Sequence, residues 1–349
     1  MASRTEFGVS TPATEVSDAF AEEIKGKNVV ITGISPDSIG GAMAMAIASK
    51  NPNKLILASR TEKKLAQVAA KILDAYPDVS VVTVLLDLAR QQSVIQAAKE
   101  INRQIDRLDV IINNAGLMVT THQFTPEGIE MQFGTNHIGH FLLTGLLLPK
   151  LRAAAKLARP GSTRVVNLAS QGHRLSPIRF HDLYFAQGAY DVPEDEQPPK
   201  GLPEAILKGK DGYPGFLAYG QSKTANILFA IELTNRFKKE GIISFSLHPG
   251  SIWTGLSRDL NPDEEVAIKK TSAVWSTHDQ GAATAVVAAF DPALSNQHGG
   301  YLIDCQLGSA GPRATDNKAA RKLWELSEEL TGYSFEGALP NIGLLGKLA

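Results

Sequence analysis

Tyr219 and Lys223 lie four residues apart in the motif YGQSK. Side chains at this spacing share one face of a helix. A phenol has a pKa of about 10, so it exchanges protons near neutral pH only when a nearby cation lowers that pKa. The Lys223 ammonium is such a cation. The pair therefore predicts proton transfer by Tyr219, although two residues on a helix surface also have this spacing by chance.

A glycine-containing loop, ITGISPDSIGG, joins an apolar run to an alanine-rich stretch at residues 31–41. Gly33 follows the expected strand, and Ile39 and Gly40 begin the expected helix. The free N–H groups and the positive dipole end of a helix start favour a dinucleotide pyrophosphate. A turn of small residues is also common without a ligand, so the loop alone leaves both interpretations open.

The middle of this loop is unusual for a phosphate site, because residues 35–38 are Ser-Pro-Asp-Ser where glycines are usual. Pro36 fixes its own φ and biases Ser35 toward an extended backbone, so rigidity replaces part of the freedom of glycine. We expect the hydroxyls of Ser35 and Ser38 to reach phosphate oxygens. Asp37 is expected to point to solvent or to cap the helix, because its carboxylate would repel a pyrophosphate.

The end of the second apolar run distinguishes the two nicotinamide dinucleotides. An NAD site usually has a carboxylate there, whereas this chain has Ser59 and Arg60. The Arg60 guanidinium can bind a 2′-phosphate through its planar fork, and Ser59 can add a hydrogen bond. The sequence therefore predicts NADP(H), whose oxidised ring would lower the pKa of Tyr219 further. The alternative is that Arg60 is a solvated residue paired with Glu62.

Two later strand ends offer further cofactor contacts. Asp87 and Leu88 lie where the adenine is expected, and the Asp87 carboxylate could accept from its amine, although an Asp there is also an ordinary turn residue. In the motif NNAG, Asn114 is expected to bond across the sheet edge, and Gly116 to let the backbone pass close to the adenosine ribose.

The elements that must position these residues follow from the hydrophobic pattern. Helical patterns at 62–75, 91–105, 132–158 and 217–240 fall between or beside seven apolar runs. The runs are NVVIT, KLILAS, VSVVTVLL, LDVIINN, TRVVNLAS, IISFSLH and GGYLID. Strands that are apolar throughout suit a parallel sheet covered on both faces. We therefore expect an α/β fold with a doubly wound parallel sheet of about seven strands, the Rossmann fold.

This domain is expected at residues 26–310, after an N-terminal tail or extra helix at 1–25 and before a C-terminal helix and tail at 311–349. Residues 173–215, which are rich in Pro, Gly, acidic and aromatic residues, predict a partly ordered insertion beside the site. Residues 253–277 predict a mobile substrate-binding segment.

Aromatic and apolar residues in these two segments indicate a lipophilic substrate, unless they only pack the segments down. They are Phe180, Tyr184, Trp253, Leu256 and Leu260.

Composition excludes several classes of protein. A formal net charge of −1 provides no basic stripe for nucleic acid. The sequence has no run of about 18 apolar residues, so no transmembrane segment is predicted. The first residues lack a signal core, so a cytoplasmic protein is expected. The single Cys305 is expected to be a buried or half-buried thiol. His137 and His140 lack a third ligand, so no metal is implied.

The motifs TNHIGHF, NLASQGH and YGQSK, together with NNAG and HPGSIWT, resemble the short-chain dehydrogenase/reductase family in their order. The resemblance covers about residues 25 to 310 and maps the family's catalytic tetrad onto Asn136, Ser170, Tyr219 and Lys223. It implies that the Ser170 hydroxyl holds the substrate oxygen and that Tyr219 transfers the proton. Lys223 would also bind the nicotinamide ribose, and Asn136 would hold a water that links the lysine to solvent.

The same resemblance places four residues of HPGSIWT beside the nicotinamide carboxamide. The expected cofactor contacts are then Gly33, Ser35, Ser38, Ile39, Gly40, Ser59, Arg60, Asp87, Leu88, Asn114, Ala115, Gly116, Tyr219, Lys223, Pro249, Gly250, Ile252 and Thr254. The chain departs from the family's pattern in two places: the 173–215 insertion separates Ser170 from Tyr219, and the phosphate loop has an extra residue, with Ser38 where the middle glycine is usual.

Within the family, the motifs look most like the retinol-dehydrogenase-like and WW-domain-oxidoreductase-like branch, and GGYLIDCQL and LWELSEELTG look like its fungal members. The resemblance implies an NADP(H)-dependent oxidoreductase that moves hydride between the nicotinamide and a lipophilic alcohol, aldehyde or ketone. A homodimer through two long helices is also expected. Two alternatives remain: a non-catalytic NADP(H)-binding regulator or scaffold, and a nucleotide-sugar epimerase or dehydratase, which would want a larger C-terminal domain.

Overall fold

Eight strands form one sheet in the computed structural model, which describes residues 2–209, 211–255, 265, 275–297 and 299–336. The strand order is β3-β2-β1-β4-β5-β6-β7-β8. β1 to β7 are parallel, and β8 is antiparallel to β7. The strands are β1 (Asn28–Thr32), β2 (Lys54–Ser59), β3 (Val81–Leu85), β4 (Val110–Asn113), β5 (Thr163–Leu168), β6 (Ile242–Leu247), β7 (Tyr301–Ile303) and β8 (Gln306–Gly308). The strand order reverses between β1 and β4, and such a switch point is where α/β sheets bind ligands.

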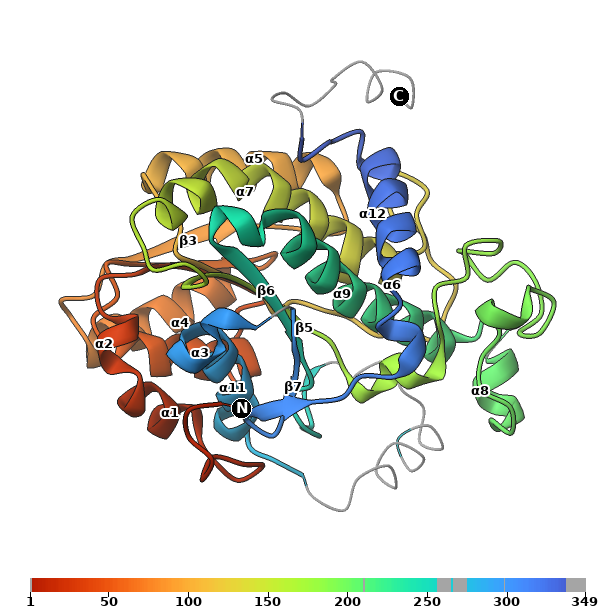
Figure 1. Ribbon diagram of the computed structural model, residues 1–349, viewed down its shortest axis with the longest axis horizontal. Coiled ribbons are helices and arrows are strands. Elements are labelled where there is room, and N and C mark those ends of the chain that lie inside the picture. Colours follow the sequence, from red (N-terminus) through yellow and green to blue (C-terminus); the bar gives the residue numbers. More distant parts are fainter. Residues whose placement is uncertain (1, 210, 256–264, 266–274, 298, 337–349) are drawn as a thin grey trace.

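Helices cover both faces of the sheet (Figure 1). One face carries α3 (Ile39–Ala48), α4 (Glu62–Ala75) and α11 (His278–Phe290), and the other carries α5 (Gln91–Gln104), α7 (Gly139–Ala155) and α9 (Gly215–Phe237). The central strands are therefore buried on both sides. In β1, Val29 and Ile31 enter the first core and Val30 enters the second. The predicted doubly wound Rossmann sheet is confirmed.

The edge strand β8 is the one strand of the described sheet that the sequence did not predict. It follows β7 through a two-residue turn, Asp304 and Cys305, with φ values of 50° and 62°. Tight hairpin turns require such positive φ values and usually have Asn or Gly there. Asp-Cys does not resemble a turn of this kind, so β8 was not expected. The Cys305 thiol is buried, as predicted.

The helical pattern at 132–158 forms three pieces instead of one helix. A single turn, α6 (Met131–Phe133), leads into a π-helical turn at Gly134–Ile138, and α7 follows. The π-helical turn contains Asn136. Such turns are frequent at functional sites because they alter which backbone groups the helix bonds internally.

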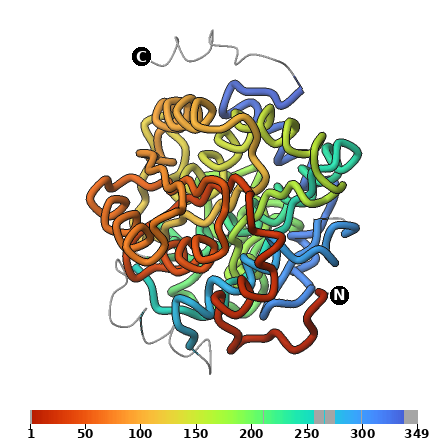
Figure 2. Tube along the Cα trace, turned by 90° about the vertical axis from the view of Figure 1, so that its left-hand side faces the viewer, coloured from red at the N-terminus to blue at the C-terminus, as the bar shows by residue number. Residues whose placement is uncertain are grey.

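The N-terminal residues lie along the α3 and α11 side of the sheet (Figure 2). They contain α1 (Ala13–Ala19) and α2 (Ala21–Ile24). The backbone N–H of Ser3 donates to Asp291, and the Gln306 amide donates to the carbonyl of Arg4. These contacts join the start of the described chain to its C-terminal strands.

Residues 173–215 contain only short helices between long irregular stretches. These are the 3₁₀ turns Gln171–Leu175 and Glu194–Glu196 and the helix α8 (Glu204–Lys208). A buried ion pair between Arg179 and Asp182, with Nη2 and Oδ2 2.6 Å apart, fixes the first part of this insertion. No helix in the described part of the chain is long and apolar enough to cross a membrane.

The C-terminal helix α12 (Asn317–Thr331) packs across α9. Its buried residues include Ala320, Leu323 and Trp324, which follow the helical period expected of an amphipathic helix. A homodimer through the two long helices α7 and α9 stays a prediction, and α12 already covers part of α9. The tail at 337–349 and most of the 253–277 segment lie outside the described residues.

The packing of α12 predicts that Trp324 contributes strongly to the stability of the fold. The Trp324 ring lies 5.1 Å from Phe141 and 4.5 Å from Phe335, centroid to centroid, and is buried. Trp324→Ala should lower the free energy of unfolding by about 3–5 kcal/mol, because it leaves a cavity among aromatic rings. Leu157→Ala is the control, since Leu157 is 77% exposed and should change stability by less than about 0.5 kcal/mol. Equal urea midpoints for the two variants would contradict this account of α12.

Candidate active site

A cleft of about 1220 Å³ opens at the carboxyl ends of the parallel strands β1 to β6. Every expected cofactor contact lines it except Gly250 and Ile252. Ile252 instead packs toward α11, where a Cβ on Gly281 would come within 2.7 Å of the Ile252 Cδ1 atom. The structure therefore brings together residues from six strand ends that are far apart in the sequence.

Two glycines of the phosphate loop are required by close packing. Gly33 has φ 77°, and a Cβ there would lie 2.6 Å from the Cα of Ala115. A Cβ on Gly40 would lie 2.6 Å from the carbonyl oxygen of Gly33. Without side chains, the first turn of α3 approaches the ends of β1 and β4. The N–H groups of Ile39 and Gly40 precede the first intrahelical hydrogen bonds, so they face the cleft as donors for an anion.

The Ser38 hydroxyl lines the cleft but caps α3, so its hydrogen is not free for a phosphate as expected. Its Oγ accepts from the N–H of Gly41 at 3.1 Å and donates to the carbonyl of Ser35 at 2.7 Å. The Ser35 hydroxyl donates to the carbonyl of Pro36 at 3.2 Å. Both hydroxyl protons are therefore used within the loop, because these local acceptors compete with any ligand. Asp37 has φ 49° and an exposed side chain, so it takes the left-handed position without capping the helix.

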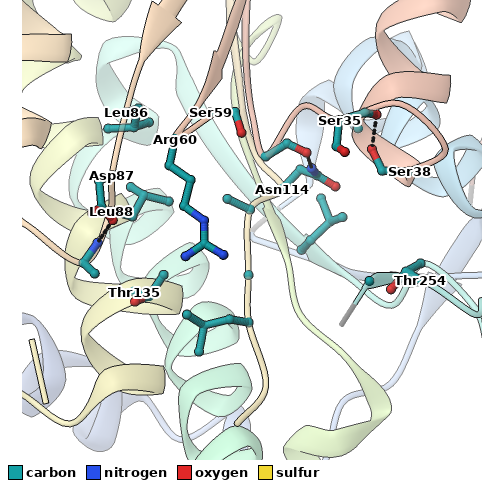
Figure 3. Close-up of a pocket in the computed structure, with 18 of the residues that line it drawn as sticks. Ser35, Ser38, Ser59, Arg60, Leu86, Asp87, Leu88, Asn114, Thr135 and Thr254 are labelled. Atoms are coloured by element: carbon teal, nitrogen blue, oxygen red, sulfur yellow. Dashed lines mark hydrogen bonds between the residues drawn. The ribbon is translucent and has the colours of Figure 1, made fainter. Parts of the chain in front are cut away.

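Basic residues gather at one end of the cleft. Figure 3 shows the Arg60 guanidinium extending into the pocket between Asp87 and Asn114. Among the described residues Arg60 forms no ion pair with Glu62, which was the alternative interpretation. Lys64 and Arg90 line the same region. Neither residue was expected at the site from the sequence, although Lys64 lies in the first turn of α4, four residues after Arg60.

Of the two contacts expected at the ends of β3 and β4, the one made by Asn114 is observed and the one made by Asp87 is not tested. The Asp87 carboxylate accepts from the N–H of Ala89 at 3.1 Å and lies 3.4 Å from the Arg90 Nε atom, so its contact with adenine stays a prediction. Asn114 bonds across the sheet edge as expected, because its Nδ2 donates to the carbonyl of Thr32 at 2.7 Å.

Gly116 lies at the catalytic end of the cleft. A Cβ on Gly116 would come within 3.3 Å of the Lys223 Nζ atom and 3.4 Å of the Asn136 Oδ1 atom. Its neighbours are thus two members of the expected tetrad. The suggested approach of Gly116 to the adenosine ribose is not tested by these contacts.

The Asn136 side chain uses its whole amide to hold neighbouring backbone. Its Oδ1 accepts from the N–H of Leu117 at 2.8 Å, and its Nδ2 donates to the carbonyl of Leu117 at 2.9 Å and to the Ser222 hydroxyl at 2.9 Å. The side chain is fully buried. Asn136 therefore ties the segment after β4 to α9, the helix that carries Tyr219 and Lys223.

Ser170 and Tyr219 meet at the other side of the same end. The Ser170 Oγ accepts from the N–H of Gly172 at 3.0 Å, and its hydroxyl is hydrogen-bonded to the Tyr219 phenol. A Cβ on Gly172 would lie 3.0 Å from the Tyr219 ring, so this glycine lets the serine turn rest on the tyrosine. The expected catalytic pair is in contact.

Burial sets the proton affinities of the tyrosine and the lysine. It raises the pKa of Tyr219 to about 12, which the Ser170 hydrogen bond opposes, and it lowers the pKa of Lys223 to about 8. The Lys223 Nζ donates to the carbonyl of Leu168 at 2.9 Å and lies 5.5 Å from the Tyr219 ring centroid. Without a cofactor, burial thus outweighs any lowering of the Tyr219 pKa by Lys223. The further lowering by a positive nicotinamide ring stays a prediction.

The aromatic residues of the insertion do not line the cleft. Phe180 and Tyr184 pack in an apolar cluster with Phe133, Leu228 and Leu323, which belong to α6, α9 and α12. They therefore stabilise the insertion and give no indication of the substrate class, contrary to our expectation. Trp253 is 39% exposed and packs edge-on against Trp275 at 5.7 Å. Leu256 and Leu260 lie outside the described residues.

Buried histidines surround the tetrad as hydrogen-bonding groups. His137 pairs with Ser327 at 2.8 Å, and His140 pairs with both Thr32 and the backbone of Asn136. Within the described ranges, no group of three or more His, Cys, Asp or Glu side chains could hold a metal.

Comparisons with known proteins agree with this geometry. A family model described as short chain dehydrogenase matches residues 27–184. The oxidoreductase fscI of Fusarium equiseti is 37% identical over 249 residues, which cover 71% of this chain and 95% of the relative. Retinol dehydrogenase 11 of Homo sapiens is 33% identical over 314 residues, which cover 90% of this chain and 88% of the relative.

Among solved structures, the fold resembles that of an NADPH-bound carbonyl reductase from chicken fatty liver. The TM-score is 0.57 at 20% identity, and the match covers 82% of this chain and 95% of the reductase. At this identity, the likeness concerns the fold.

The buried histidines predict a fall in stability in mild acid. Burial lowers the pKa of His137 to about 3 and those of His140 and His248 to about 4, and it also lowers the pKa of His173. An unfolded histidine titrates near pH 6.5, so the unfolded chain binds more protons below that pH. Stability should be complete above about pH 6.5 and decline as the pH falls toward 4.

The expected slope is as much as about 4 kcal/mol per pH unit, because His137, His140 and His248 each contribute up to about 1.4 kcal/mol. Burial raises the pKa of Glu130, which acts against this slope. Urea midpoints between pH 7.5 and 5 measure the slope. His122→Gln is the control because His122 is exposed, and its slope should match that of the wild type. A stability that does not change over this interval would contradict the assignment of neutral buried histidines.

Proposed function

Because this chain belongs to the short-chain dehydrogenase/reductase family, in its retinol-dehydrogenase-like branch, we propose that it is an NADP(H)-dependent oxidoreductase that interconverts alcohols with aldehydes or ketones. The observation that carries the proposal is that Tyr219 and Lys223 line one end of a cleft large enough for a dinucleotide, with Ser170 hydrogen-bonded to Tyr219 beside it. A protein that only sensed the cofactor would not need the serine and the tyrosine.

The residues of the cleft fit a dinucleotide with an additional phosphate. The glycine-packed start of α3 offers backbone donors for the pyrophosphate, and Arg60, Lys64 and Arg90 offer positive charge near the end of β2. Arg60 is the proposed ligand of the 2′-phosphate because a guanidinium binds phosphate through two parallel hydrogen bonds. When bound, the nicotinamide supplies the hydride for reduction or accepts it for oxidation.

The chain's own residues would handle the substrate oxygen and its proton. In reduction, Ser170 and Tyr219 hydrogen-bond to the carbonyl oxygen, and Tyr219 gives up its phenolic proton as the alcohol forms. The Lys223 ammonium stabilises the phenolate that remains, which matters in a buried site where water does not solvate the charge. In oxidation, the same phenol oxygen accepts the hydroxyl proton.

A lipophilic alcohol, aldehyde or ketone is the proposed substrate class. Support comes from the relatives named retinol dehydrogenase and from the Trp253–Trp275 pair, which lies next to Thr254 on the rim of the cleft. Phe180 and Tyr184 no longer contribute to this argument, since they are packed elsewhere.

The mechanism predicts that Tyr219→Phe abolishes turnover and still binds cofactor. The variant keeps the ring against Gly172 and loses only the proton donor, so kcat should fall by at least about 1000-fold. Purified protein with NADPH and a panel of long-chain aldehydes and ketones gives the rate from the loss of NADPH absorbance, and NADPH fluorescence gives binding. Unchanged turnover in the variant would reject the role of Tyr219. Tight NADPH binding by a wild type without turnover across the panel would favour the regulator.

The cofactor assignment predicts that Arg60→Asp shifts preference from NADPH toward NADH. The ratio of kcat/KM for the two cofactors should fall by about 10- to 100-fold, because a charge-assisted contact to the 2′-phosphate is lost and a repulsive charge is added. Lys63→Asp changes charge by the same amount on the adjacent turn, and Lys63 does not line the cleft. An equal shift in both variants would mean that only the general field acts, and no shift in Arg60→Asp would reject the contact.

A further inference from the structure

His173 lies behind the serine, in the 3₁₀ turn that begins after Ser170. Its Nδ1 atom is 2.6 Å from the carbonyl oxygen of Ser170. The backbone N–H of Gly311 donates to its Nε2 atom at 2.8 Å, across 138 positions of sequence. One imidazole thus connects the backbone at the serine to the segment that follows β8.

These two partners determine the hydrogen positions on the ring. A backbone carbonyl only accepts, so the Nδ1 atom must carry the hydrogen that Ser170 receives. A backbone N–H only donates, so the Nε2 atom must be the unprotonated acceptor of the Gly311 hydrogen. His173 is therefore a neutral imidazole with its hydrogen on Nδ1. Either the other tautomer or the imidazolium would place two donors against each other at Gly311.

Other contacts hold the same turn to its surroundings. The Tyr301 ring packs edge-on against His173 at 5.4 Å. The Thr224 hydroxyl on α9 shares its one hydrogen between the carbonyls of His173 and Ser176, at 3.0 and 2.7 Å. Arg174 extends to the carbonyl of Ser309 at 2.9 Å. The turn is thus fixed between the catalytic helix and residues 309–311, and His173 is the member that bonds the Ser170 backbone directly.

We propose that His173 is a positioning residue that fixes the Ser170 backbone to Gly311 and so keeps the Ser170 hydroxyl directed at the Tyr219 phenol. The role rests on the proposed function, because it matters only if Ser170 binds a substrate oxygen. The Ser170 hydroxyl is directed by its own backbone turn and by the N–H of Gly172. A displacement of the turn by about 1 Å would misalign that hydroxyl, and such errors can reduce rates about 100-fold.

Three substitutions of His173 distinguish the effect of losing each hydrogen bond from the effect of losing the ring. His173→Phe keeps a ring against Tyr301 and loses both bonds, so kcat should fall by about 10- to 100-fold with an unchanged NADPH dissociation constant. His173→Asn retains a donor at the δ position for the Ser170 carbonyl, so its loss should stay below about tenfold. His173→Gln retains an acceptor that can extend toward Gly311 but loses the donor, so its loss should lie near that of His173→Phe.

A double-mutant cycle with Ser170→Ala tests whether the histidine acts through the serine. If it does, His173→Phe should slow the wild type and have little further effect in the Ser170→Ala background. A loss of kcat by the same factor in both backgrounds would mean a general structural role and would overturn the proposal. No loss in the wild-type background would overturn it as well. The assay uses the full chain, NADPH and the carbonyl compound that the wild type reduces best.

Two further measurements test the proposal without relying on His173→Phe. If His173→Phe does not fold, the cycle is completed with His173→Asn and His173→Gln, whose different losses are predicted above. NMR shifts of the imidazole nitrogens in the wild type should show the Nδ1–H tautomer for His173, and an Nε2–H tautomer would overturn the proposal. A wild type without turnover would reject the proposed function and this role with it, whereas wild-type turnover that is insensitive to His173 rejects the role alone.

Discussion

The site depends on the hydrogen bonds of one buried group, the hydroxyl of Thr32 at the end of β1. Its oxygen accepts from the N–H groups of Asn114 and Ala115, each at 3.0 Å. Two accepted bonds use both lone pairs, so its own hydrogen must go to His140, whose Nε2 atom is 2.9 Å away. The Nδ1 hydrogen of His140 then goes to the carbonyl of Asn136 at 3.0 Å. One buried hydroxyl thereby fixes the phosphate loop, the end of β4 and the π-helical turn relative to each other, and each group in this network is satisfied only in this arrangement.

Around that network the side chains are buried, and burial changes the chemistry of each member. Burying an ammonium disfavours its charge, which is why the pKa of Lys223 falls to about 8. The carbonyl of Leu168 offsets part of this cost by accepting from Lys223 and from Asn226. The same burial raises the pKa of Tyr219, so the resting phenol holds its proton firmly. A phenolate therefore becomes favourable only when a positive charge arrives close by, and the chain provides room for one beside Gly116. In the proposed mechanism, proton transfer by Tyr219 would in this way be coupled to cofactor binding by electrostatics.

The sheet and the Tyr219–Lys223 pair could be predicted from the sequence because both depend on local patterns, whereas Asn136 and Ser170 were assigned from the resemblance to the family. Apolar runs report strands that helices cover, and a spacing of four reports a shared helix face. The failures have a different origin. Ser38 was expected at the phosphates, but a nearby carbonyl and a helix N–H use its hydroxyl, and the sequence does not reveal that competition. Phe180 and Tyr184 were expected at the substrate, but they pack on α6, α9 and α12, contacts between segments that are distant in the chain. The π-helical turn has no signature in the hydrophobic period, so Asn136 was placed correctly on a helix whose shape was not foreseen.

The insertion between Ser170 and Tyr219 is long, yet the two side chains remain in contact, and the catalytic helix explains why. Gln221 lies between Tyr219 and Lys223 on α9, and its amide accepts from the N–H of Arg179 at 2.8 Å and donates to the carbonyl of Leu183 at 2.9 Å. Thr224, next to Lys223, donates to the carbonyl of Ser176 at 2.7 Å. The helix thus holds the first part of the insertion as tightly as it holds the tetrad. Extra residues beyond these contacts add little, because the entropy of closing a loop grows only with the logarithm of its length. The spacing between serine and tyrosine in the sequence is therefore free to vary, while their spacing in the fold is set by residues on α9.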